Sequence, residues 1–116
     1  MIKQKVEEII NEVFPKIEKH YGNSKFQECS PYIELEKSIF KNSCHAEYCS
    51  LINEISIYYP KMKSKKMVIQ TLIHEYIHYL QSPTWFKRYY NMGYSYNDHP
   101  YELEAIRHEQ DYKLFL

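Results

Sequence analysis

The segment from residue 74 to residue 78 reads His-Glu-Tyr-Ile-His and holds the side chains best suited to chemistry. On an α-helix each residue advances about 100°, so His74 and His78 lie about 40° apart and one turn apart along the axis. Two neutral imidazoles at this spacing can point at one cation, and imidazole is a preferred ligand of zinc. Glu75 lies about 60–100° around the helix from the pair, where it can reach a water on the metal without becoming a ligand. The pattern predicts Zn²⁺ bound by His74 and His78, with Glu75 as a general base.

The helix that carries this pattern is predicted over residues 65–81. Apolar residues recur through it at three- and four-residue steps, as on a helix with one buried face: Ile69, Leu72, Ile73, Tyr76, Ile77 and Leu80. His74 and His78 fall about 130–170° from the centre of that face. We therefore expect them to line a second surface, where a cleft can form; the alternative is that they are exposed residues without a role. Ser82 and Pro83 are expected to close the helix.

A third ligand is expected from another element, because a catalytic zinc usually has three protein ligands and one open position. The last helix is predicted over residues 101–116, starting at a capping acid and a proline in its first turn. Glu102 borders its apolar-leaning face beside the small Ala105, whereas Glu104 points about 160° away. Glu102 is therefore the predicted third ligand, with Glu104 and His99 as alternatives.

The sequence HEYIH on such a helix, followed by Glu102-Leu103-Glu104-Ala105 on the next, resembles the gluzincin branch of the HExxH metallopeptidases. It is most similar to the minimal single-domain members and to the ImmA/IrrE-type phage-immunity peptidases. Their third ligand is a glutamate that opens a Glu-x-x-Ala or Glu-x-x-Ser pattern, so the resemblance implies Glu102 as ligand and Ala105 as the small residue. The resemblance extends over residues 53–110 in the order of the elements, namely an edge strand, the metal helix, a connecting loop and a glutamate helix.

The resemblance implies a zincin-like fold and a metallopeptidase that hydrolyses peptide bonds of a peptide or protein substrate with a zinc-activated water. It also implies that the strand at residues 55–59 is the edge that pairs with an extended peptide. One position departs from the family, which often has Asp or Asn directly after the small residue, where it orients a ligand histidine. Here that position is Ile106. Loss of such an acceptor commonly weakens metal binding about 10–100-fold, and Asp98 or Glu109 could replace it.

A donor to the developing oxyanion is expected between the two metal-binding helices. The candidates there are Tyr94, Tyr96, Tyr101 and His99. The chain has 13 tyrosines, so residue type alone does not choose among the four.

The remainder of the chain predicts an α+β fold. Residues 2–21 have the period of an amphipathic helix that Pro15 would kink or divide, ended by the turn residues Gly22, Asn23 and Ser24.

Apolar and polar residues alternate over 32–36 and 53–59, which predicts two half-buried strands, and a third strand is predicted near residues 47–52. Together they would form a small mixed sheet. Residues 84–99 are predicted as a loop with one or two helical turns.

Length and composition favour a single domain over residues 1–116. The 44% apolar and 26% charged shares are ordinary for a folded protein, and 15 basic residues balance 15 acidic ones. We therefore expect neither nucleic acid nor membrane as a partner. There is no apolar run of about 20 residues, and acids interrupt the N-terminal apolar pattern, which argues against a signal peptide. Three cysteines agree with reduced thiols and a cytoplasmic location.

Other interpretations remain open. Cys29, Cys44, His45 and Cys49 could form a second zinc site, but their spacing fits no common zinc finger, and unreactive thiols are favoured. The domain could also be a regulatory or binding module with a structural or absent metal, a latent enzyme, or a zinc hydrolase of a non-peptide amide. The sequence does not indicate the substrate or the oligomeric state.

Overall fold

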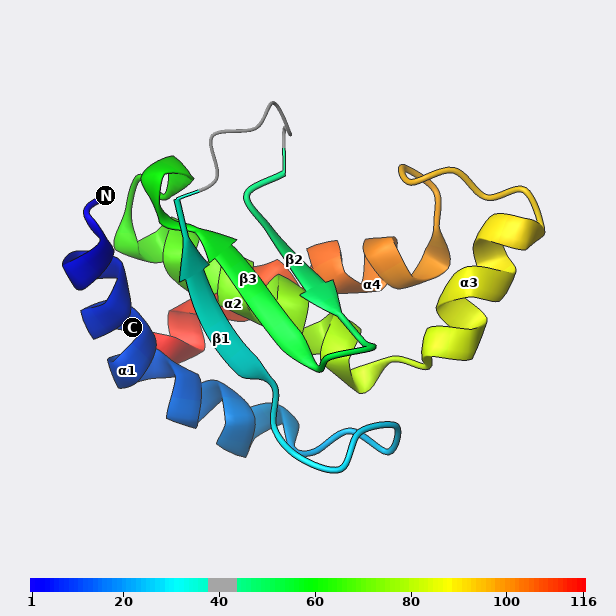
Figure 1. Cartoon of the computed structure of the whole chain (residues 1–116), viewed down its shortest axis with the longest axis horizontal. Helices are drawn as coiled ribbons and strands as arrows, with labels where there is room; N and C mark the ends of the chain where they lie inside the picture. Colours follow the sequence, from blue (N-terminus) through cyan, green and yellow to red (C-terminus); the bar gives the residue numbers. More distant parts are fainter. Residues whose placement is uncertain (38–43) are drawn as a thin grey trace.

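The computed structural model describes residues 1–37 and 44–116. In chain order its elements are α1 (Lys3–Tyr21), β1 (Tyr32–Glu36), β2 (Ala46–Cys49), β3 (Glu54–Tyr58), the 3-10 helix η1 (Tyr59–Lys61), α2 (Lys65–Leu80), α3 (Pro83–Asn91), α4 (Pro100–His108) and the 3-10 helix η2 (Glu109–Phe115). The described part thus contains four α-helices and a three-stranded mixed sheet, which confirms the α+β class (Figure 1).

The sheet has the strand order β1-β3-β2, with β1 parallel and β2 antiparallel to β3. In the central strand, Ile55 and Ile57 are completely buried and Tyr58 is nearly so. The prediction that residues 55–59 form a half-buried edge strand is therefore wrong, because β3 has a neighbour on each side. The edge strand that lies beside α2 is β2.

Helix α1 supplies much of the core. Its apolar period buries one face of the helix, made by Val6, Ile9, Ile10, Val13 and Ile17. That face packs against α2. Pro15 lies inside α1 without dividing it, and the helix ends at Gly22, whose φ of 81° favours glycine. Within residues 1–37 and 44–116, no helix combines the length and the apolar character needed to span a lipid bilayer.

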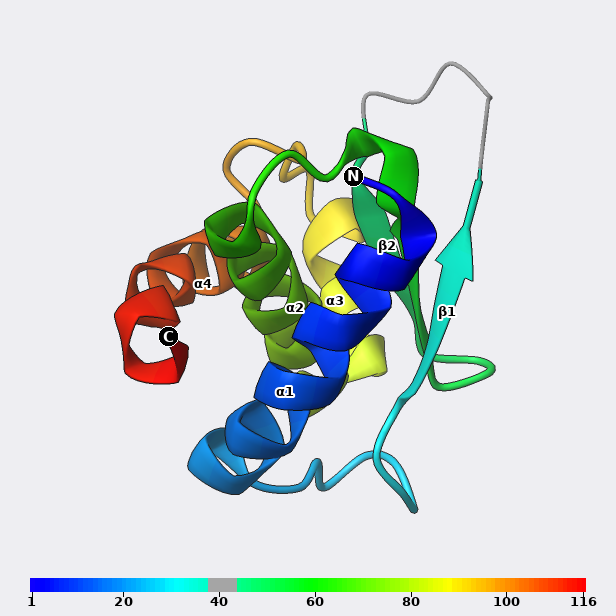
Figure 2. The same ribbon diagram turned by 90° about the vertical axis from the view of Figure 1, so that its left-hand side faces the viewer.

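The molecule is built in layers around α2. Figure 2 shows the sheet on one side, α1 and α2 in the middle, and α4 with the C-terminal η2 on the other side. Helix α2 begins at the N-cap Ser64, whose hydroxyl accepts a hydrogen bond from the Met67 amide. Glu75 and Tyr79 are buried in addition to most of the predicted apolar stripe, of which Leu80 is only half-buried, and the Tyr79 ring packs against Tyr48 of β2.

The connection after α2 differs from the prediction. Ser82 and Pro83 do not simply close α2; they begin α3, and the Ser82 hydroxyl accepts a hydrogen bond from the Trp85 amide. Helix α3 starts at Pro83 and occupies residues 84–91 of the segment predicted mainly as loop, although it has no buried residue.

The last helix also differs. Its N-cap is His99 in place of the predicted Asp98, which instead accepts hydrogen bonds from Ser95. Helix α4 ends at His108, and the remainder is the 3-10 helix η2, so the predicted single helix over 101–116 has two parts.

Candidate metal centre

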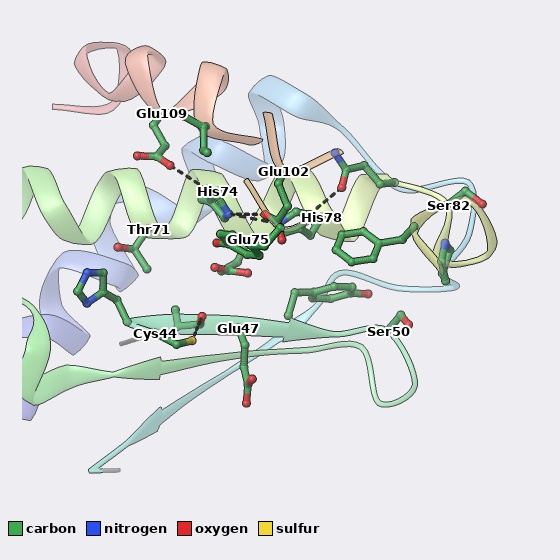
Figure 3. A pocket seen from close by; sticks show the side chains of 18 of the residues that line it. Cys44, Glu47, Ser50, Thr71, His74, Glu75, His78, Ser82, Glu102 and Glu109 are labelled. Atoms are coloured by element: carbon green, nitrogen blue, oxygen red, sulfur yellow. Dashed lines mark hydrogen bonds and ion pairs between the residues drawn. The ribbon is translucent and has the colours of Figure 1, made fainter. Parts of the chain in front are cut away.

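The structure brings together the three residues predicted as metal ligands. Nε2 of His74 and Nε2 of His78 lie 3.2 Å apart, and Oε1 of Glu102 lies 3.2 Å from the first and 2.8 Å from the second (Figure 3). Helix α2 supplies both imidazoles on successive turns, and α4 crosses it with Glu102 in its first turn. The histidines are half-buried and Glu102 is buried.

The separations within this triad suit a zinc ion. Zinc bonds to nitrogen and oxygen ligands are about 2.0–2.1 Å long, so two ligand atoms in a tetrahedral site lie about 3.3 Å apart. The observed separations of 2.8 to 3.2 Å are only slightly shorter. A cation of that size therefore fits after a small outward shift of the three side chains.

The outer nitrogens of both imidazoles are held by acceptors. Nδ1 of His74 lies 2.8 Å from Oε2 of Glu109, and Nδ1 of His78 lies 2.7 Å from Oε1 of Gln81. A carboxylate and an amide oxygen can only accept, so each Nδ1 keeps its proton and donates it. Nε2 of each ring faces the Glu102 carboxylate, and it can bind a cation once it has given up any proton that it shares with that carboxylate.

The charges of the triad are strongly coupled. Burial disfavours the charged form of His74, but hydrogen bonds to Glu102 and Glu109 outweigh it and raise the pKa of this imidazole well above its ordinary value. Burial also disfavours the Glu102 carboxylate, yet hydrogen bonds to His74 and His78 lower its pKa to about 2. Glu102 is thus held as an anion beside the two imidazoles, the charge that a cation ligand requires.

The other candidate ligands lie outside the triad. Oε1 of Glu104 accepts a hydrogen bond from Nε2 of Gln81 at 2.7 Å. His99 is completely buried; its Nε2 donates to the carbonyl of Phe86, and its Nδ1 accepts from the Tyr101 amide. His99 therefore links α4 to α3, and Glu104 links α4 to the end of α2. Glu102 alone of the three reaches the histidines.

Gln81 is a site residue that sequence reasoning missed. Its carbonyl holds His78, while its amino group donates to the Tyr101 carbonyl and to Glu104. It therefore ties the end of α2 to the start of α4. Its position three residues after His78 is the signal that was available, because residues three apart on a helix are neighbours.

Glu75 is a buried carboxylate beside the triad. It is 7% exposed and makes no hydrogen bond within the described part of the chain. Burial raises the pKa of its carboxyl group, although His78 and His74 act in the opposite direction. Figure 3 shows its carboxylate on the side of α2 that faces β2, close to the triad but outside it.

The triad and Glu75 line one cleft of about 900 Å³, walled by α2, α3, α4 and β2. Of the four candidate oxyanion donors, Tyr96 is the one found among the described lining residues. Burial raises its pKa to about 12, helped by the nearby Glu102 and Glu75, so its hydroxyl keeps its proton. The arrangement therefore combines a cation site, a buried carboxylate and a hydroxyl donor in one open space.

Comparisons with protein-family models, with curated proteins and with solved structures give no match for this chain. The functional argument therefore depends on the geometry of the cleft.

The cysteines form no second metal site in the described part, where the triad is the one group of His, Cys, Asp and Glu side chains able to hold a cation. The Cys44 thiol lines the cleft and donates to the Ala46 carbonyl. Cys49 is half-buried and Cys29 is exposed, and all three thiols are free.

Proposed function

We propose that this chain is a zinc-dependent metallopeptidase with a zincin-like fold of the gluzincin type. The observation that carries the proposal is the convergence of two imidazole Nε2 atoms and the Glu102 carboxylate beside the buried Glu75 in one cleft. Two histidines and one glutamate, with the fourth side open, are a ligand set of catalytic zinc. The same donors also suit Fe²⁺, so the identity of the metal is the first point to measure.

The residues around the triad supply the remaining chemistry of amide hydrolysis. A zinc ion bound there would act as a Lewis acid and would lower the pKa of a coordinated water to about 7. Glu75 has a raised pKa and lies at the cleft wall, so it can accept the proton of the attacking water and pass it to the leaving amine. Tyr96 lines the same space, and its hydroxyl can donate to the developing oxyanion.

A peptide substrate is favoured by the strand that forms one wall of the cleft. Within residues 1–37 and 44–116, β2 pairs with β3 on one side only, and most of its residues line the cleft. An exposed strand edge can bind an extended peptide through main-chain hydrogen bonds. We therefore assign to β2 the substrate-pairing role that the resemblance implies for residues 55–59.

The test uses purified protein and the variant Glu75→Gln, with Glu34→Gln on the exposed side of β1 as matched control. Metal analysis is expected to find about one zinc per chain in all three proteins. A fluorescently labelled unfolded protein should be cleaved by the wild type and by Glu34→Gln, but at least about 100-fold more slowly by Glu75→Gln.

Absence of zinc, or equal cleavage by Glu75→Gln, would contradict the proposal. If zinc is bound and no peptide is cut, while biological activity survives in Glu75→Gln, a binding module is favoured. If simple amides are hydrolysed in a Glu75-dependent way but peptides are not, the chain is a hydrolase of non-peptide amides.

A further inference from the structure

We infer that the cleft binds an internal, extended stretch of polypeptide, cut near its middle, with a bulky apolar side chain held against Phe86 beside the cut. This makes the protein an endopeptidase that prefers a large apolar residue at one position. The inference rests on the proposed peptidase function and adds the substrate class and a residue that selects it.

The length of the cleft sets the length of its occupant. Its walls run from Thr71 to Gln81 along α2, which at 1.5 Å per residue is about 15 Å. On the opposite wall they run from Cys44 to Ser50, which is about 20 Å of extended chain. An extended peptide advances about 3.3 Å per residue, so four or five residues match the length of the α2 wall and about six match the opposite wall.

The candidate metal ligands lie in the middle of this length. His74 is three residues from Thr71, and His78 is three residues from Gln81. Figure 3 shows the triad between Thr71 and Cys44 on one side and Ser50 and Ser82 on the other. Substrate residues can therefore be bound on both sides of the cut bond, which a cleft that closes beside the metal would not allow.

The charged side chains of the cleft give little support for ionic capture of a substrate terminus. The one exception is a lysine. Three of its acidic side chains are Glu75 and the metal-site residues Glu102 and Glu109. Apart from histidines, Lys87 is the only cationic side chain among the described lining residues, and it is exposed. The competing interpretation is that Lys87 captures the free C-terminal carboxylate of a substrate, and the experiment must distinguish it from cleavage at an internal bond.

Phe86 forms a rigid apolar wall next to one ligand. Its ring centroid lies 5.3 Å from that of His78, and it also lies on the cleft surface. Behind it, the His99 ring lies at 4.4 Å and the Tyr90 ring at 5.7 Å, so neighbouring aromatic rings fix its position. A substrate side chain packed on Phe86 would be within one or two residues of the cut bond, because the two ring centroids are 5.3 Å apart and consecutive residues of an extended chain are about 3.3 Å apart.

The first experiment uses decapeptides that are N-acetylated and C-amidated, with a single central Phe or, in a matched set, a central Ala. Zinc-loaded protein is expected to cut the blocked Phe peptide at an internal bond next to Phe, found by mass spectrometry. The Ala peptide should be cut at least about tenfold more slowly, since loss of even one methylene from an apolar pocket costs about 10–200-fold. The same peptides with free termini should be cut at the same bond and at a similar rate.

The second experiment replaces Phe86 by Ala and by Leu, with Phe26→Ala as control on an exposed loop outside the cleft. The ratio of kcat/KM for the Phe peptide over the Ala peptide is expected to fall at least about fivefold in Phe86→Ala, to fall less in Phe86→Leu, and to stay unchanged in the control. Zinc content is measured for each protein because Phe86 contacts His78. The affinity for the labelled Phe peptide is also compared between Glu75→Gln and the double variant Glu75→Gln/Phe86→Ala, which tests the contact with Phe86 without turnover.

The outcomes separate the inference from the proposed function. Two results would overturn the endopeptidase inference and leave the peptidase function standing. One is cleavage only at a chain end. The other is cleavage of peptides with free termini but not of amidated peptides, if that cleavage disappears in Lys87→Gln. An unchanged Phe-to-Ala ratio in zinc-loaded Phe86→Ala would overturn the role of Phe86. No Glu75-dependent cleavage of any peptide would overturn the function itself and the inference with it.

Discussion

Oε2 of Glu109 lies 2.8 Å from Nδ1 of His74, so the first residue of η2 holds a ligand of the candidate metal site. Glu109 and Glu102 are seven residues apart and would lie within about 20° of each other on a helix, so one face of the C-terminal segment carries both carboxylates to α2. Two contacts hold this segment in place: Tyr21 donates to Asp111, and Gln70 donates to the Glu109 carbonyl. The chain thus supplies from Glu109 the acceptor that Ile106 does not provide.

Replacing Glu109 should weaken zinc binding, by an amount that depends on the substitution. In Glu109→Leu the His74 N–H loses its acceptor, and the dissociation constant for zinc is expected to rise about 10–100-fold. In Glu109→Gln the amide oxygen can still accept, so the rise should be smaller. Titration against a competing chelator measures both, with Glu34→Gln as control. Wild-type affinity in Glu109→Leu would show that this contact does not orient the ligand.

Gln81 is expected to affect the stability of the protein even without metal. In Gln81→Leu the N–H of His78 loses its acceptor, and the Tyr101 carbonyl and Glu104 lose a donor. Buried polar groups left without a partner cost about 1–3 kcal/mol, so the free energy of unfolding should fall by that amount. Urea denaturation of the metal-free protein measures it, with the exposed Gln110→Leu as control. Equal denaturation midpoints for Gln81→Leu and the control would mean that these hydrogen bonds add no net stability.

The elements that follow from local pattern were predictable from the sequence. The period of α2 placed His74 and His78 outside its main apolar stripe, and spacing on the next helix favoured Glu102 over Glu104. Both inferences need only the geometry of a single helix. The three side chains converge in the structure as that geometry requires.

Features that depend on how elements pack were not predictable in the same way. Strand order is non-local, so the alternation in β3 did not show that β1 and β2 flank it. Helix α3 has no buried residue, and its apolar rings contact His99 and each other, so it lacks the period of a core-facing helix. The choice between Asp98 and Glu109 as partner of His74 depended on where α4 ends, which the predicted continuous helix over 101–116 did not give.

Asp111 should make a pH-dependent contribution to stability. Its pKa lies below the ordinary value, chiefly because the Tyr21 hydroxyl donates to it and also because of His108. A carboxyl group with a lowered pKa in the folded state stabilises the protein above its unfolded pKa of about 3.9, and this is lost as the pH falls through the folded value. Asp111→Asn should therefore be less stable than wild type at pH 7, by at most about 1 kcal/mol because the group is partly exposed. Urea denaturation at pH 7 and pH 3 tests the sign, and a difference that grows on acidification would contradict it.

Tyr96 should act on turnover and not on metal binding. In Tyr96→Phe the hydroxyl donor is lost while the ring stays, so kcat is expected to fall about 100-fold with little change in zinc content. Tyr94→Phe is the matched control, because Tyr94 lies two residues away and is not among the described residues that line the cleft. Since the pKa of Tyr96 is raised to about 12, its hydroxyl remains protonated across the neutral and mildly alkaline range. The kcat ratio of wild type to Tyr96→Phe should therefore stay constant from pH 7 to about pH 10. A ratio that falls toward one over that range would show that the phenol ionises there and that another group is the donor.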